Sequence, residues 1–144
     1  MYENQIFALL GHNGAGKTTT MNVLTGLIAP DIANDRSLAY IYGRNIAKDM
    51  DTIRLSLGIC PQHDVLFEKL SVKEHILFFS QLKGYSYDEA HQEAVSLTKL
   101  FHLGNRLDHL GTELSGGQKR KLSVAIAVCG GSKFVVLDEP TAGK

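Results

Sequence analysis

The residues from Gly11 to Thr18 carry the clearest chemical signal in the chain. Their sequence, Gly-His-Asn-Gly-Ala-Gly-Lys-Thr, fits the pattern G-x-x-x-x-G-K-[ST]. Glycines in such a run let successive backbone N–H groups point toward one anion, and the start of a following helix adds partial positive charge. Lys17 supplies a full charge near the β- and γ-phosphates, and the Thr18 hydroxyl can ligate Mg²⁺. We therefore expect this segment to bind the phosphates of a nucleotide.

Two acidic residues follow an apolar run near the other end of the chain. Asp138 and Glu139 come directly after Phe134–Leu137, which has the composition of a buried parallel strand. Carboxylates at the carboxyl end of such a strand lie where open α/β sheets bind ligands. Beside a phosphate-binding loop, we expect Asp138 to hold Mg²⁺ and Glu139 to polarise the attacking water. The alternative is a pair of surface acids without a catalytic role.

A second glycine-containing helix start lies at Leu114–Gln118, which reads Leu-Ser-Gly-Gly-Gln. Ser115 and the two glycines after it predict a second anion site at a helix N-terminus. Two such sites in one chain are most simply explained if each copy of the protein completes a nucleotide held by a partner. Taken alone, the pentapeptide could equally be a flexible helix cap, but its position before Asp138 and Glu139 favours the nucleotide interpretation.

The elements that must position these residues follow from the spacing of apolar side chains. Pro61 cannot donate to a sheet, so the chain should leave the sheet there, and serines followed by glutamates predict capping boxes at Ser71 and Ser86. The expected elements are a buried strand at 6–10, a helix at 17–27 that packs Met21 and Leu24, strands at 38–42 and 58–60, a short helix at 51–57, helices starting at Ser71 and Ser86, a helix through 119–128 and a strand at 134–137.

Composition narrows the class of protein. Lys and Arg together number 15, as do Asp and Glu, so the neutral chain gives no reason to expect nucleic acid or an anionic membrane surface as a partner. Cys60 and Cys129 lie in apolar segments and are expected to be reduced core thiols.

The longest apolar run, 122–131, is too short to cross a bilayer, so we expect a soluble chain. The charged face with Glu89, Glu93 and Lys99 is expected to be solvated.

The combination of motifs resembles the nucleotide-binding domain of ABC transporters. Gly11–Thr18 matches the Walker A motif, Gln62 the glutamine loop, Leu114–Gln118 the signature motif, and Phe134–Glu139 Walker B with its catalytic glutamate. The amino-acid sequences of residues 11–20, 60–67, 119–127 and 137–143 are similar to those of subfamily A, whose members mostly move lipids and sterols.

The resemblance implies a fold and a set of roles. The fold class is α/β, a P-loop NTPase core of the ABC ATPase type with a mostly parallel sheet, truncated at both ends; the core is 1–62 and 131–144, and a helical insert spans approximately 68–128. Glu139 and Lys17 are the implied catalytic residues. The implied ligand sets are Gly11, Asn13, Gly14, Ala15, Gly16, Lys17, Thr18, Thr19 and Gln62 for ATP, Thr18, Gln62 and Asp138 for Mg²⁺, and Ser115, Gly116, Gly117 and Gln118 for the nucleotide of the opposite subunit.

The resemblance also implies partners. These are a second nucleotide-binding domain in a head-to-tail pair and the transmembrane domains of a parent lipid transporter, contacted through Gln62–Glu68 on the cytoplasmic side of the membrane. One alternative is a soluble ABC ATPase of the translation or DNA-repair type. Another is a truncated nucleotide-binding module without turnover. The family's D-loop aspartate and switch histidine lie downstream of Walker B, and this sequence ends before them.

Overall fold

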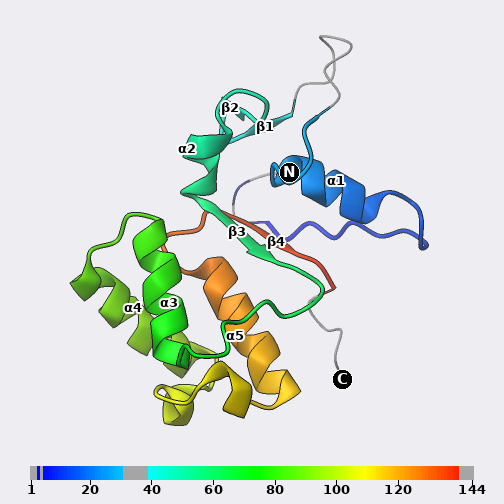
Figure 1. Ribbon diagram of the computed structural model, residues 1–144. Helices are drawn as coiled ribbons and strands as arrows, with labels where there is room; N and C mark the ends of the chain where they lie inside the picture. Colours follow the sequence, from blue (N-terminus) through cyan, green and yellow to red (C-terminus); the bar gives the residue numbers. More distant parts are fainter. Residues whose placement is uncertain (1–2, 4, 31–38, 140–144) are drawn as a thin grey trace.

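The computed structural model describes residues 3, 5–30 and 39–139, which form an α/β arrangement (Figure 1). In chain order the elements are α1 (Lys17–Leu24), β1 (Tyr40–Ile41), β2 (Arg44–Asn45), α2 (Met50–Arg54), β3 (Leu57–Cys60), α3 (Val72–Leu82), α4 (Tyr87–Leu100), 3-10 turns at Gly104–Arg106 and Gly111–Glu113, α5 (Gly116–Val128) and β4 (Phe134–Leu137). No helix in these ranges is long and apolar enough to span a membrane.

The strands β3 and β4 are the centre of the arrangement. They pair in parallel, from Leu57 opposite Phe134 to Cys60 opposite Leu137, so both strands end at the same edge. Figure 1 shows α3, α4 and α5 gathered on one side of this pair, with α1, α2 and the β1–β2 hairpin on the other. The edge where both strands end is therefore the place to which the chain brings Gln62, Asp138 and Glu139.

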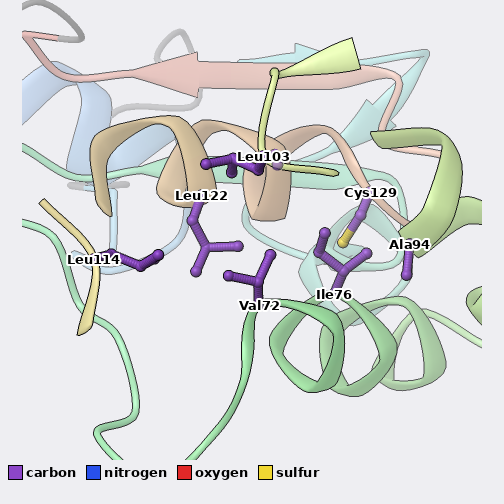
Figure 2. Packing of buried hydrophobic residues seen from close by; sticks show 8 residues of the cluster. Val72, Ile76, Ala94, Leu103, Leu114, Leu122 and Cys129 are labelled. Atoms are coloured by element: carbon purple, nitrogen blue, oxygen red, sulfur yellow. The ribbon is translucent and has the colours of Figure 1, made fainter. Parts of the chain in front are cut away.

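The three long helices pack around one apolar cluster. Figure 2 shows Val72 and Ile76 of α3 beside Ala94 of α4 and Leu122 of α5, all fully buried. Both predicted capping boxes are present at the starts of α3 and α4, with Ser71 and Ser86 each accepting from and donating to a glutamate three residues on. Because α5 also packs against β3 and β4, the division into core and helical insert stays a prediction.

The predicted strand at Ile6–Leu10 is wrong. This segment forms no strand, and its side chains lie in solvent, with Ile6 fully exposed and Leu10 88% exposed. A parallel strand is stable when neighbouring strands pair with it and helices cover both of its faces. The segment is hydrogen-bonded to neither β3 nor β4, so its apolar composition alone does not make it a strand.

Two other boundaries differ from expectation for identifiable local reasons. Helix α1 ends at Leu24 rather than Leu27, because Gly26 has φ 71° and the N–H of Leu27 reaches back to the Asn22 carbonyl, which is a Schellman ending. The expected strand at 38–42 is a two-residue strand in a tight hairpin that turns at Gly43. Leu38 and the polar segment 31–37 lie outside the described residues.

The expectation that Glu93 is solvated is also wrong. Its carboxylate accepts the Ser80 hydroxyl at 2.6 Å and the Gly130 N–H at 2.9 Å. The neighbouring Lys83 ammonium donates to the Cys129 carbonyl at 2.9 Å, and burial lowers the pKa of this lysine. These bonds tie the end of α5 to α3 and α4. Both cysteines are buried and free, as expected of core thiols.

His75 fixes the loop that follows Gln62. Its Nε2 accepts the Phe67 N–H at 2.9 Å, so its Nδ1 carries the proton and donates to the Ser71 carbonyl at 2.7 Å. The side chain is fully buried, and desolvation lowers its pKa below the ordinary 6.5, although the Ser71 carbonyl and the Glu74 charge oppose this. A proton added to Nε2 would break the bond to Phe67.

We expect the free energy of unfolding to fall as the pH drops below 6.5, the unfolded-state value for histidine. Below that pH the unfolded chain binds a proton that the folded chain resists, so stability is fully present above 6.5 and is lost with a slope of at most about 1.4 kcal/mol per pH unit. Urea unfolding between pH 5 and 8 measures this slope. His75→Gln should flatten it, and His63→Gln, at an exposed histidine, should not; equal slopes in all three proteins would contradict the assignment.

Candidate functional site

The loop from Gly11 to Gly16 has the backbone that its glycines allow. Gly14 and Gly16 have φ values of 84° and 83°, in the left-handed region that L side chains rarely adopt. Gly11 approaches Ala15 so closely that an added Cβ would lie 3.1 Å from the Ala15 Cβ. Gly16 is the N-cap of α1, and no side chain caps this helix.

This uncapped helix start leaves an open cradle of donors. The N–H groups of Gly16, Lys17, Thr18 and Thr19 have no acceptor among the residues that the structure describes, as is expected at a helix N-terminus without a cap. The Lys17 ammonium folds back across the loop and donates to the carbonyls of Gly11 at 2.6 Å and His12 at 3.0 Å. The loop and the helix start therefore offer several unbonded N–H donors and one cation within a few residues of one another, the chemistry that a phosphate group requires.

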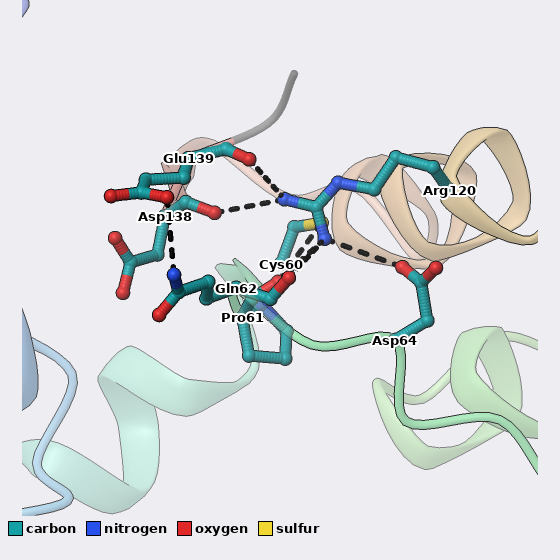
Figure 3. Close-up of polar contacts among 7 residues, drawn as sticks. All are labelled: Cys60, Pro61, Gln62, Asp64, Arg120, Asp138 and Glu139. Carbon is teal, nitrogen blue, oxygen red and sulfur yellow. Dashed lines mark hydrogen bonds and ion pairs between the residues drawn. The ribbon is translucent and has the colours of Figure 1, made fainter. Parts of the chain in front are cut away.

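The ends of β3 and β4 place three predicted site residues together. Gln62 follows β3 by two residues, and Asp138 and Glu139 come directly after β4 (Figure 3). The Gln62 Nε2 donates to the Glu139 Oε2 at 3.1 Å. Glu139 has φ 45°, an uncommon value for a residue with a side chain, and such outliers cluster at functional sites. The Asp138 carboxylate has no hydrogen bond within the described part of the chain, so it is available to a ligand.

Arg120 is a residue of this site that the sequence analysis missed. It lies in the second turn of α5, and only 9% of its surface is exposed. Figure 3 shows its guanidinium between the two strand ends, where it reaches carbonyl oxygens of both segments. The sequence placed it in a run of basic residues, Lys119 to Lys121, which is typical of a solvated helix face. Only the burial of one member of that run distinguishes it from its neighbours.

The signature segment starts helix α5 with a capping box. The Ser115 hydroxyl accepts the Gln118 N–H at 3.3 Å, and the Gln118 Oε1 accepts the Ser115 N–H at 2.9 Å. The N–H groups of Gly116 and Gly117 remain without an acceptor among the described residues, so a donor pair is left at this helix start. Whether these donors meet a nucleotide stays a prediction.

The predicted residues therefore form three separate groups. Gln62 and Glu139 are in contact, and Asp138 lies beside them. No hydrogen bond or ion pair joins either Lys17 or Thr18 to Asp138 within the ranges that the structure describes. The signature segment bonds to neither of the other two groups, although Arg120, on the same helix, bonds to the strand ends.

Comparison with known proteins reveals close relatives. The human protein "ATP-binding cassette sub-family A member 2" is 52% identical over 143 residues, and the mouse "Phospholipid-transporting ATPase ABCA3" is also 52% identical over 143 residues. The mouse "Retinal-specific phospholipid-transporting ATPase ABCA4" is 53% identical over 142 residues. Each match covers 99% of this chain but only 6% to 8% of the relative. These identities confirm the predicted resemblance to subfamily A.

A solved structure supports the fold. The chain called "Structure of ATP binding subunit of ABC transporter" matches with a TM-score of 0.80 and 30% sequence identity, covering 93% of this chain and 54% of that one. This similarity confirms the expected α/β fold of the ABC ATPase type. The family model described as "ABC transporter" matches residues 1–142, from before the glycine-rich loop to beyond the paired acids. The chain belongs to the ABC transporter family.

Proposed function

We propose that this chain binds ATP at the loop Gly11–Thr18 and takes part in its hydrolysis. The observation that supports this most directly is the open start of α1, where N–H groups of Gly16 to Thr19 lack acceptors among the described residues and Lys17 lies across the loop. A triphosphate supplies the negative charge and the oxygen acceptors that this arrangement leaves unmet. The Lys17 ammonium exchanges the carbonyls of Gly11 and His12 for the β- and γ-phosphates when ATP binds.

The residues present fit a bound Mg²⁺. The Thr18 hydroxyl, the Gln62 amide oxygen and the Asp138 carboxylate are hard oxygen donors, and none of these oxygens has a hydrogen-bond partner within the described ranges. Those ranges contain no cluster of three or more His, Cys, Asp or Glu side chains that could hold a metal ion by themselves, so the phosphates would have to supply some of the ligands. Mg²⁺ is usually held by one or two protein groups together with substrate phosphates, and when bound it would neutralise charge on the phosphates.

Glu139 is proposed as the base that polarises the attacking water. Its carboxylate receives a hydrogen bond from Gln62, which holds it at the edge where β3 and β4 end. Gln62 begins the loop that we expect to contact membrane domains, so a movement of that loop would also move the base. This contact would link ATP hydrolysis to the state of the membrane domains.

We further propose that the full-length protein uses this ATPase to transport lipids across a membrane. The relatives named as phospholipid-transporting ATPases support this function. In this proposal the chain lies on the cytoplasmic side and pairs head to tail with a second nucleotide-binding domain. Ser115 and Gly117 of each domain then close over the γ-phosphate held by the other.

Two substitutions test the split site. In the full-length protein, Lys17→Ala should weaken ATP binding by about 10- to 100-fold, the effect of losing hydrogen bonds between a charged group and its ligand. Ser115→Arg should leave ATP binding intact and abolish hydrolysis, because it obstructs the partner's nucleotide and not the chain's own. Binding of a fluorescent ATP analogue and release of phosphate measure the two effects separately.

Lys48→Ala is the control, because Lys48 is exposed and makes no side-chain hydrogen bond within the described part of the chain. It should leave both binding and hydrolysis unchanged. Equal loss of ATP binding in Lys17→Ala and Ser115→Arg would contradict the assignment of the two segments to different nucleotides.

A further inference from the structure

We propose that Arg120 is a positioning residue that holds the Gln62 loop and the catalytic Glu139 in register with the signature helix. The inference rests on the proposed hydrolytic function and adds to it a mechanical connection within one subunit. The bonds from Arg120 to the two strand ends go to backbone carbonyls and not to the carboxylates of Asp138 and Glu139. It acts through the backbone that carries Gln62 and Glu139 (Figure 3).

The guanidinium joins the two strand ends with its two terminal nitrogens. One nitrogen donates to the Pro61 carbonyl at 2.6 Å and lies 3.4 Å from the Gln62 carbonyl. The other donates to the Asp138 carbonyl at 2.8 Å and the Glu139 carbonyl at 2.9 Å. The planar group therefore lies between the two segments and bonds to the backbone of both.

The two segments need such a bridge because their sheet ladder stops just before them. The last ladder bond runs from the Asp138 N–H to the Cys60 carbonyl at 2.9 Å. The residue that follows β3 is Pro61, which has no N–H to donate. The carbonyls beyond it still require donors, and a guanidinium offers five N–H groups in a fixed plane. Arg120 thus supplies the hydrogen bonds that connect the two segments beyond the proline, where the sheet ladder has ended.

One further contact, to Asp64, holds the guanidinium in place. Its first nitrogen lies 3.3 Å from the Asp64 carboxylate, and the Arg120 and Asp64 side chains are only 11% and 24% exposed. The Glu139 backbone, at φ 45°, is an unfavourable conformation that its surroundings must maintain. The bond from Arg120 to the Glu139 carbonyl is one such restraint.

Because Arg120 lies on α5, its bonds connect the signature segment to the backbone of Glu139. The helix begins at the Ser115 cap, in the segment proposed to meet the partner's nucleotide, and Arg120 lies one turn further along. A shift of the helix start upon dimer closure would reach the Glu139 backbone through the guanidinium. Arg120 would therefore make the position of the base depend on the presence of the opposite subunit.

The test uses the full-length protein with Arg120→Met, which keeps a long side chain but removes every donor. We expect kcat to fall by about 100-fold, the loss associated with a misplacement of about 1 Å in a catalytic group, while ATP affinity stays unchanged. Hydrogen–deuterium exchange should increase in peptides that cover 62–64 and 134–139 and not in the helix 72–82. Lys121→Met removes an exposed charge from the same helix and should change none of these quantities.

Arg120→Lys separates charge from geometry. One ammonium carries the same charge but cannot bond to both strand ends in the manner of the planar fork, so kcat should still fall by at least about tenfold, the equivalent of one lost hydrogen bond to a charged group. Wild-type kcat in this variant would overturn the proposal. If Arg120→Met does not fold, the exchange pattern and kcat of the lysine variant decide the question.

The outcomes also distinguish this inference from the proposed function. Undiminished hydrolysis in Glu139→Gln would refute the role of Glu139 as base, yet faster exchange confined to 62–64 and 134–139 in Arg120→Met would still support the bridge. Wild-type exchange in both segments, or a parallel loss of ATP affinity and kcat, would overturn the positioning role even if Glu139 is the base.

Discussion

ATP hydrolysis by the full-length protein should fall by about 10²- to 10⁴-fold when Glu139 is replaced by Gln, which is the usual contribution of a general base. The replacement preserves the local geometry. The Gln62 Nε2 now donates to a carboxylate oxygen at 3.1 Å, and the amide oxygen of a glutamine can accept the same bond. Because shape and hydrogen bonding are retained, the lost activity reports the lost proton acceptor. Phosphate release under saturating ATP measures the change.

ATP binding should not weaken in the same variant, because removing a negative charge beside the triphosphate cannot reduce attraction to it. Asp88→Asn is the matched control, since it makes the same acid-to-amide change at the start of α4, where Asp88 is exposed and belongs to none of the proposed site groups. It should hydrolyse ATP at the wild-type rate. Hydrolysis by Glu139→Gln within a factor of about two of wild type, far below the usual effect of a base, would show that another group activates the water.

Much of the local structure could be predicted because its causes lie within a few residues. The capping boxes at Ser71 and Ser86 each join residues three positions apart, so the starts of α3 and α4 are legible in the sequence. Pro61 ends β3 for a reason carried by one residue. The apolar run 134–137 and the acids after it likewise place Asp138 and Glu139 at a strand end.

The features that could not be predicted depend on partners far along the chain. Arg120 bonds to carbonyls 59 residues before it and 19 residues after it, and backbone carbonyls carry no sequence signal. Glu93 similarly caps the backbone of Gly130, 37 residues away. In both cases a charged side chain that looks solvated is held by main-chain groups that only the folded chain brings near.

The error at Ile6–Leu10 has the opposite cause. Here the composition indicates burial, but a strand exists only when another strand supplies its hydrogen bonds. The pairing of β3 with β4 satisfies that requirement, and the segment 6–10 pairs with neither. The apolar pattern can therefore indicate that a segment tends to be buried, but pairing with another strand decides whether it forms a strand.

The close approach of β3 and α5 leads to a second large expected effect, on stability. Gly58 lies in β3, and a Cβ added there would lie 1.7 Å from the Ala127 carbonyl oxygen and 2.7 Å from its carbon. These are backbone atoms, so no rotamer change can relieve the overlap. Gly58→Ala should therefore destabilise the protein by about 3 kcal/mol or more, at the upper end of overpacking effects, and lower Tm by roughly 10 °C. Thermal unfolding followed by circular dichroism measures this.

Two further variants show whether the backbone contact is the cause. Gly104→Ala adds the same methyl group where no atom lies within 4 Å of the added carbon, so it should be neutral or slightly stabilising. Ala127→Gly removes a side chain but neither of the contacting atoms, so combining it with Gly58→Ala should not restore Tm. Recovery in the double variant would place the clash at a side chain instead. Because α5 also carries Arg120, a displaced helix should lower ATP hydrolysis at temperatures well below the new Tm, linking strand packing to the site.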